Sequence, residues 1–224
     1  MKAPRYITHI RRLREIEAPS ANFFLSGMLR LQEKLGPILW QFPPSFQFVA
    51  DVFETFLAQL PHSTAEAAKL LNHCDARVKG RTWTVIDADR PLRHAVEIRH
   101  ASFVTPVFTD LLRKYRAALV SADTAGNWPM LHDVTADFVY VRMHGAEELY
   151  ASGYTEEALD AWAAKIRAWS NGGDAPGAAR TGPAAPKCAK RDMYVYFDND
   201  AKVRSPVDAA RLAVKLGLRD RPIR

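Results

Sequence analysis

The segment Phe138-Val-Tyr-Val-Arg-Met-His-Gly145 alternates between two kinds of side chain, and this alternation constrains the fold more than any other feature. One row is apolar throughout, whereas the other ends in Arg142 and His144. A period of two is typical of a β-strand, whose successive side chains point to opposite faces of the sheet. Because the ionisable residues stand only at its end, the segment is predicted to be a parallel barrel strand. One face packs on helices, and the other points toward a site at the C-terminal end.

The whole chain alternates between strand-like and helix-like segments. Helical patterns are predicted over residues 22–35, 46–60, 64–73, about 102–116, 155–169 and 205–216, with Asn22 as the cap of the first. Six strands are predicted, near Lys2, Ile38, Val96, Val120, Val139 and Val195. Such alternation implies a parallel sheet, either doubly wound or closed. No Gly-rich phosphate turn follows the first strand, and polar residues end nearly every strand. Both observations favour an α/β fold of the TIM (β/α)8 type, with about six of the eight units present.

Five sequence blocks carry a resemblance to a known family. They are KAPRYITH, LGPILWQFPPSF, AVEIRHASF, FVYVRMHG with Tyr154 downstream, and YVYFDNDA. Together they resemble the YecE-like family (domain of unknown function 72), and they occur in its order along nearly the whole chain. The resemblance implies a TIM barrel but no activity, since the family is largely uncharacterised. The family's first two strands and first helix have no counterpart here, and Phe103 stands where the family usually has Trp.

The domain organisation follows from these elements. Residues 1–224 are predicted to form a single YecE-like barrel domain that is incomplete at its N-terminus. We expect either an upstream segment or a partner chain, such as a second subunit of an oligomer, to fill the gap. Residues 171–190 are rich in Gly, Ala and Pro, so this loop is predicted to be disordered and to have no catalytic role.

Eight polar residues are expected to converge where the strands end. Glu97, Asp123 and His144 are the candidates for acid–base catalysis, because carboxyl and imidazole groups transfer protons near neutral pH. The other five are candidate substrate-binding residues: Lys2, Gln41, Arg99, Arg142 and Asp198. Arginine forks suit phosphate or carboxylate groups. The alternative is an internal ion-pair lattice that only fixes strand register, because structural networks also collect charges.

Two other chemistries use overlapping residues. A metal site could be built from Glu97, Asp123, His144 and His9, but two arginines in the same space would repel a divalent ion. We therefore expect neither a metal nor a cofactor. A glycosidase would need two carboxyl groups across the scissile bond, and Glu97 with Asp123 could supply them, although the sequence does not set their separation.

Composition limits the class of partner. The chain has a net charge of +6 and a pI of about 9.4, which suits an anionic partner, and no apolar run is long enough to span a membrane. The two distant cysteines and the lack of a signal sequence indicate a cytoplasmic protein. The favoured function is binding or conversion of an anionic small molecule, as a hydrolase or lyase if it is an enzyme. The alternative is a nucleic-acid-binding or phosphodiester-processing barrel.

Overall fold

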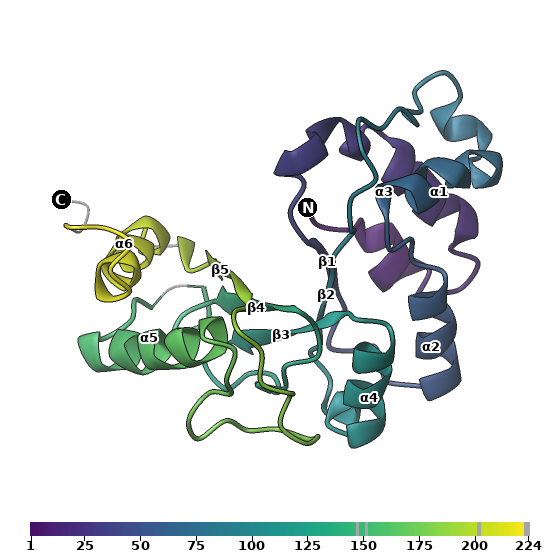
Figure 1. The fold of residues 1–224 in the computed structure, drawn as a ribbon. Helices are drawn as coiled ribbons and strands as arrows, with labels where there is room; N and C mark the ends of the chain where they lie inside the picture. The colour runs from purple at the N-terminus through teal and green to yellow at the C-terminus, as the bar shows by residue number, and fades with distance from the viewer. Residues whose placement is uncertain (147, 151, 201–202, 222–224) are drawn as a thin grey trace.

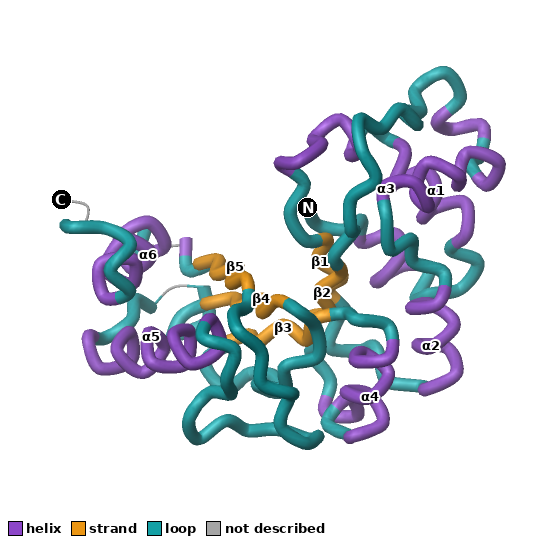
Figure 2. Tube along the Cα trace, viewed as in Figure 1, coloured by secondary structure: helices purple, strands orange, loops and turns teal. Residues whose placement is uncertain are grey.

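The computed structural model describes residues 1–146, 148–150, 152–200 and 203–221, and its centre is one parallel sheet. The strands lie side by side in the order in which they occur in the chain, and the sheet curls into a half-barrel with helices on its outer face (Figures 1 and 2). The strands are β1 (Ile38–Gln41), β2 (His94–Glu97), β3 (Ala118–Asp123), β4 (Phe138–Met143) and β5 (Asp192–Phe197). The predicted α/β class and parallel sheet are therefore confirmed.

The helices follow the strands as the periodicity predicted, with some different bounds. They are α1 (Glu17–Leu25), α2 (Ala50–Ala58), α3 (Thr64–Ala68), α4 (Pro106–Lys114), α5 (Glu156–Ser170) and α6 (Ser205–Lys215). Shorter helical turns cover Tyr6–Ile10, Met28–Lys34, Lys69–His73, Ala76–Val78 and Ala101–Phe103. Ser63 caps α3 by accepting a hydrogen bond from the Glu66 N–H, and Thr155 caps α5 by accepting one from Ala158.

Two predictions for the N-terminal region are wrong. The strand expected near Lys2 is only a single parallel bridge to Leu39, so the described part of the sheet has five strands rather than six. The helix expected over 22–35 instead begins at Glu17 and ends at Leu25, because Gly27 adopts a left-handed conformation (φ 104°) that stops it. Asn22 lies inside α1, and its side-chain oxygen accepts a hydrogen bond from the Asp75 N–H.

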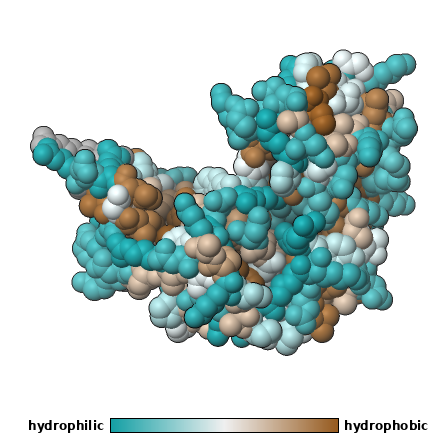
Figure 3. Space-filling view, in the orientation of Figure 1, coloured by the Kyte–Doolittle hydropathy of each residue, from teal (hydrophilic) through white to brown (hydrophobic). Residues whose placement is uncertain are grey.

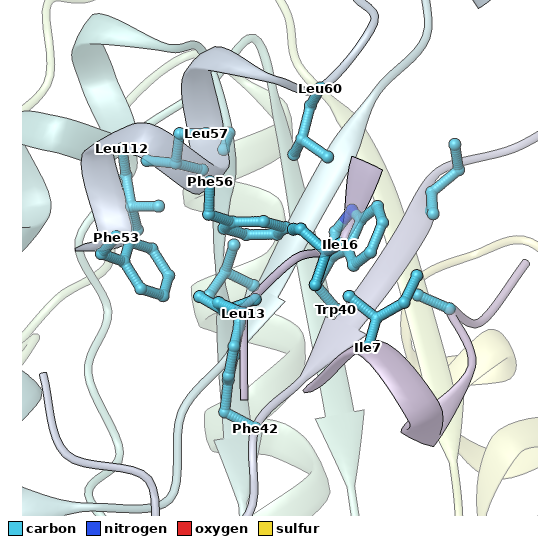
Figure 4. Packing of buried hydrophobic residues seen from close by; sticks show 14 of the residues in the cluster. Ile7, Leu13, Ile16, Trp40, Phe42, Phe53, Phe56, Leu57, Leu60 and Leu112 are labelled. Carbon is cyan, nitrogen blue, oxygen red and sulfur yellow. The ribbon is translucent and has the colours of Figure 1, made fainter. Parts of the chain in front are cut away.

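Aromatic residues fill the space between the N-terminal strands and their helices (Figure 4). Trp40 of β1 meets Phe56 of α2 edge-on, with ring centroids 5.1 Å apart. The indole N–H of Trp40 donates to His94 Nδ1 at 3.1 Å, and His94 Nε2 lies 2.8 Å from the Pro61 carbonyl. Burying each such ring stabilises the fold by about 1.5–3 kcal/mol, so this cluster anchors the outer face of β1 and β2.

A second apolar cluster covers the outer face of β4. Val139, Val141 and Met143 pack against Trp162 and other apolar residues of α5. This is the row of the alternating segment that was predicted to face helices. The prediction for that strand is therefore confirmed, and its other row faces the interior of the half-barrel.

The inner face of the sheet is lined by small and aromatic side chains. In β3 the inward residues are Ala118, Val120 and Ala122, which pack with Phe138 and Tyr140 of β4. Asp123, which was expected among the inward residues, instead lies on the outer face of β3. The small inward side chains leave room for the large rings of β4, and the polar groups on the outer face find partners among the helices and loops.

The loop at 171–190 is held by several hydrogen bonds. The Asp133 carboxylate accepts from the Thr181 and Gly182 N–H groups at 3.0 and 2.9 Å, and the His132 N–H donates to the Ala179 carbonyl at 2.8 Å. The disorder expected for this loop stays a prediction. No helix in the described ranges is long and apolar enough to cross a membrane.

The sheet is open along the part of the chain that the structure describes. β1 and β5 are the first and last strands in its order, and Figure 1 shows a wide opening between them. Figure 3 shows the corresponding notch between the arm that carries α6 and the N-terminal helices. Tyr196 of β5 points inward by parity with Tyr194 but is 47% exposed, so the described residues leave this end of the inner face partly uncovered.

Candidate functional site

Glu97 is the centre of a hydrogen-bond network at the C-terminal ends of the strands, a rim called the mouth below. Its side chain is 0% exposed, and both of its oxygens are used. Oε1 accepts from Gln41 Nε2 at 2.7 Å and from Arg99 Nε at 3.0 Å, and Oε2 accepts from Arg142 Nη1 at 2.6 Å. Burial alone would raise the pKa of Glu97, but Arg142 and Arg99 outweigh it and hold the pKa below its usual value.

Arg99 is held in place from three sides. Besides its bonds to Glu97, its Nη2 donates to the Tyr150 hydroxyl at 3.2 Å. Its guanidinium carbon lies 4.0 Å from the centroid of the Trp128 ring, a cation–π contact. Among the described residues, Arg99 Nη1 makes no hydrogen bond. The arginine is therefore oriented, with one end left for another group.

Asp198 connects Arg142 to His144. Arg142 Nη2 donates to Asp198 Oδ2 at 2.6 Å, and His144 Nδ1 lies 3.0 Å from the same oxygen. The contact with His144 and the charge of Arg142 hold the pKa of Asp198 below its usual value. His144 is fully buried and meets the Tyr150 ring edge-on at 5.1 Å between centroids, whereas the Asp198 side chain is 36% exposed. Of the bonded pair Asp198 and His144, Asp198 is thus the residue that a ligand can reach.

An open cavity of about 490 Å³ lies above this network. Its walls come from the N-terminal segment, from β1 and β4, and from the segments that follow β2, β4 and β5. The lining residues are Lys2, Arg5, His9, Gln41, Arg99, Arg142, Tyr150, Asp198 and Asp200. The volume is in the range of small-molecule sites.

The cavity has a positive electrostatic character on one side. Partial burial and then the charge of Arg142 lower the pKa of Lys2. Partial burial and then the charges of Arg5, Lys2 and Arg99 lower the pKa of His9. Within the described ranges, Lys2 Nζ and the Arg5 guanidinium make neither a hydrogen bond nor an ion pair. This side therefore offers cationic donors that make no close ion pair with the described residues.

Seven of the eight predicted site residues come together at the mouth, and one does not. Lys2, Gln41, Arg99, Arg142 and Asp198 line the cavity, while Glu97 and His144 lie beneath it. The structure places these seven positions together. Their roles in catalysis or binding stay predictions.

Asp123 is the exception, and its placement in the mouth was wrong. It lies on the outer face of β3, where Asp123 Oδ2 accepts a hydrogen bond from Trp162 Nε1 at 3.2 Å. The structure therefore does not assemble the metal set considered from the sequence, nor the carboxylate pair of Glu97 and Asp123. A polar residue at a strand end is not enough to identify the inward face when helix side chains can bond it.

Two cavity residues were missed by the sequence reasoning. Arg5 follows the bridge at Lys2, and Asp200 lies beyond the end of β5. Asp200 begins a helical turn, so strand parity does not predict where its side chain points. Arg5 lies at the start of a helical turn, where strand parity does not apply.

Comparison with known protein families shows to which family the chain belongs. The family model described as "Protein of unknown function DUF72" matches residues 1–223. The chain belongs to this family. The match confirms the resemblance found in the sequence blocks and extends it over almost every residue. No curated protein matches the sequence.

Two solved structures of the DUF72 family share the fold. A family protein from Thermotoga maritima MSB8 is 20% identical with a TM-score of 0.64, and the match covers 97% of this chain and 72% of that one. A second from Enterococcus faecalis V583 is 15% identical with a TM-score of 0.57, covering 84% of this chain and 60% of that one. At these identities the likeness concerns the fold alone.

Proposed function

We propose that the mouth binds a small molecule carrying a phosphate or carboxylate group. The observation that supports this most is the set of cationic donors around the 490 Å³ cavity. Lys2 Nζ, the Arg5 guanidinium and Arg99 Nη1 have no hydrogen-bond partner among the described residues. An anion would fill these donors with charge-assisted hydrogen bonds. A purely structural ion-pair lattice would leave no such surplus at a cavity wall.

Within this proposal the network residues have different roles. Glu97 positions Arg99 and Arg142, because both of its oxygens are already engaged and its side chain is fully buried. Asp198, whose side chain is 36% exposed, is the carboxylate of this network that can touch a ligand. If the protein is a hydrolase or lyase, Asp198 is therefore better placed for contact with the reacting group than Glu97 or His144.

The number of βα units in the half-barrel bears on where a ligand site should lie. We infer that the half-barrel corresponds to about six βα units of a (β/α)8 barrel, with the bridge at Lys2 as the remnant of the sixth strand position. Ligand sites in such barrels lie at the C-terminal ends of the strands. The cavity at the mouth agrees with that rule.

Calorimetric titration of the purified chain with inorganic phosphate, and separately with malonate, tests the function. We expect saturable binding of at least one of them, and Lys2→Met should weaken it by about tenfold through loss of a charge-assisted contact. The matched control is Lys34→Met. Lys34 is an exposed lysine in the helical turn Met28–Lys34, and it does not line the cavity at the mouth. No binding of either anion, or equal losses in the two variants, would contradict the proposal.

A second candidate is a phosphodiester or nucleic-acid ligand. Arg11, Arg12 and Arg14 follow Arg5 in the sequence and line a second cavity of about 450 Å³. A salt series separates the two candidates. A ligand that contacts several phosphates loses affinity steeply and linearly with the logarithm of salt concentration, whereas one small anion gives a shallow slope.

A further inference from the structure

The cavity at the mouth is lined by two chemically different sets of side chains, called the cationic wall and the carboxylate wall below. The cationic wall consists of Lys2, Arg5 and Arg99, as described above. The opposite chemistry comes from the segment after β5, where Asp198 and Asp200 both line the same cavity. A simple anion would use the first wall and leave the second unoccupied.

The carboxylate wall has acceptor capacity to spare. Asp198 Oδ2 is taken by Arg142 and His144, but Oδ1 makes no hydrogen bond with the described residues. The Asp200 carboxylate likewise has no hydrogen bond or ion pair within the described ranges. Gln41 uses its Nε2 to reach Glu97, which leaves its amide oxygen as a further acceptor in the cavity. A ligand that fits this wall must carry hydrogen-bond donors.

The charge balance selects the kind of donor. The site holds four cations (Lys2, Arg5, Arg99 and Arg142) and three carboxylates (Glu97, Asp198 and Asp200). An ammonium group would add positive charge to a site that is already positive on balance. Hydroxyl groups donate hydrogen bonds without adding charge, and the anionic group of the same ligand offsets the surplus.

We propose that the ligand is a phosphorylated or carboxylated polyol, of which a sugar phosphate is the simplest example. Its anionic group binds Lys2, Arg5 and Arg99, and its hydroxyl groups donate to Asp198, Asp200 and the Gln41 amide oxygen. This inference rests on the proposed function and adds the substrate class.

Calorimetric titration with matched probes tests whether the ligand is a polyol. The probes are glucose 6-phosphate, butyl phosphate, which keeps the phosphate but has no hydroxyl groups, and phosphoethanolamine, which replaces them with an ammonium. We expect glucose 6-phosphate to bind about tenfold more tightly than butyl phosphate, which corresponds to about 1.4 kcal/mol. Equal affinity of these two would overturn the polyol class. Tighter binding of phosphoethanolamine would overturn the argument from charge balance.

Two variants test which part of the ligand each wall of the cavity binds. Asp200→Asn should remove most of the advantage of glucose 6-phosphate and leave butyl phosphate unchanged, whereas Lys2→Met should weaken both. Asp51→Asn, at an exposed position in the first turn of α2, is the matched control. An Asp200→Asn variant that keeps the full advantage contradicts the inference but not the proposed function. If neither phosphate ester nor malonate binds at all, the proposed function fails with it.

Discussion

Glu97 Oε2 accepts a 2.6 Å hydrogen bond from Arg142 Nη1, although their strands, β2 and β4, are separated by β3. The contact crosses the inner face of the half-barrel. Ala122 of β3 lies beside Arg142 in the sheet register, and its small side chain leaves the path open. The pair therefore ties together non-adjacent strands and sets the floor of the cavity.

Replacing Glu97 should destabilise the fold strongly. Glu97→Gln leaves the guanidinium groups of Arg142 and Arg99 without their shared counter-ion in a buried site, which costs about 3–5 kcal/mol of unfolding free energy. Urea denaturation followed by circular dichroism measures this loss. The control is Glu54→Gln, because Glu54 forms an exposed ion pair with Lys114 and should matter little. Similar midpoints for the two variants would show that the network is not a structural unit.

Stability should fall between about pH 6.5 and pH 4 because of two buried histidines. Burial lowers the pKa of His94 and of His132 from 6.5 to about 4, and Lys165 adds to the effect at His132. In that window the unfolded chain takes up protons that the folded chain does not, so unfolding becomes easier as the pH falls. Each histidine can contribute up to about 3 kcal/mol.

Below about pH 4 the folded histidines protonate as well, and their contribution to the slope ends. His132→Asn removes one titrating group, so its unfolding free energy should depend less on pH than that of the wild type. Urea denaturation at several pH values between 7 and 4 checks this. Parallel pH profiles for the two proteins would show that folding does not lower the pKa of His132 and would contradict the prediction.

Asp123 should matter for stability and not for the ligand. Asp123→Ala leaves Trp162 Nε1 without its acceptor, which costs about 1–3 kcal/mol. Affinity for phosphate should stay at the wild-type value, because Asp123 lies on the outer face of β3. Calorimetric titration of the folded variant checks this, with Lys2→Met as the comparison. A loss of affinity as large as that of Lys2→Met would restore Asp123 to the binding site.

The open edge of β5 should promote self-association. Parallel strands with unpaired backbone groups tend to pair with other chains, and the half-exposed Tyr196 adds apolar surface beside that edge. Sedimentation velocity should show an average mass that rises with protein concentration. Tyr196→Lys should reduce this rise, because an edge lysine opposes pairing. A monomer at all concentrations with a cooperative melt would contradict the prediction.

Strand parity was predictable from the sequence wherever one row of a strand is purely aliphatic. In β4 the valines and Met143 can only face helices, so Arg142 must point inward, and the same reasoning places Glu97 on the inner face of β2. Burial of apolar surface decides these orientations, and a single sequence records it directly. The family resemblance, carried by five separate blocks, came from the sequence as well.

Tertiary structure alone decided the orientation of β3 and the accessibility of the carboxylates. Both rows of β3 contain small or apolar residues, so its inward face depends on the space left by Tyr140 and on the Trp162 indole that bonds Asp123. Whether Glu97 or Asp198 meets the cavity depends on donors from β1, β2 and β4 that converge only after folding. Residue type determines which groups can ionise. The packing of distant segments determines which of them remain free to bind.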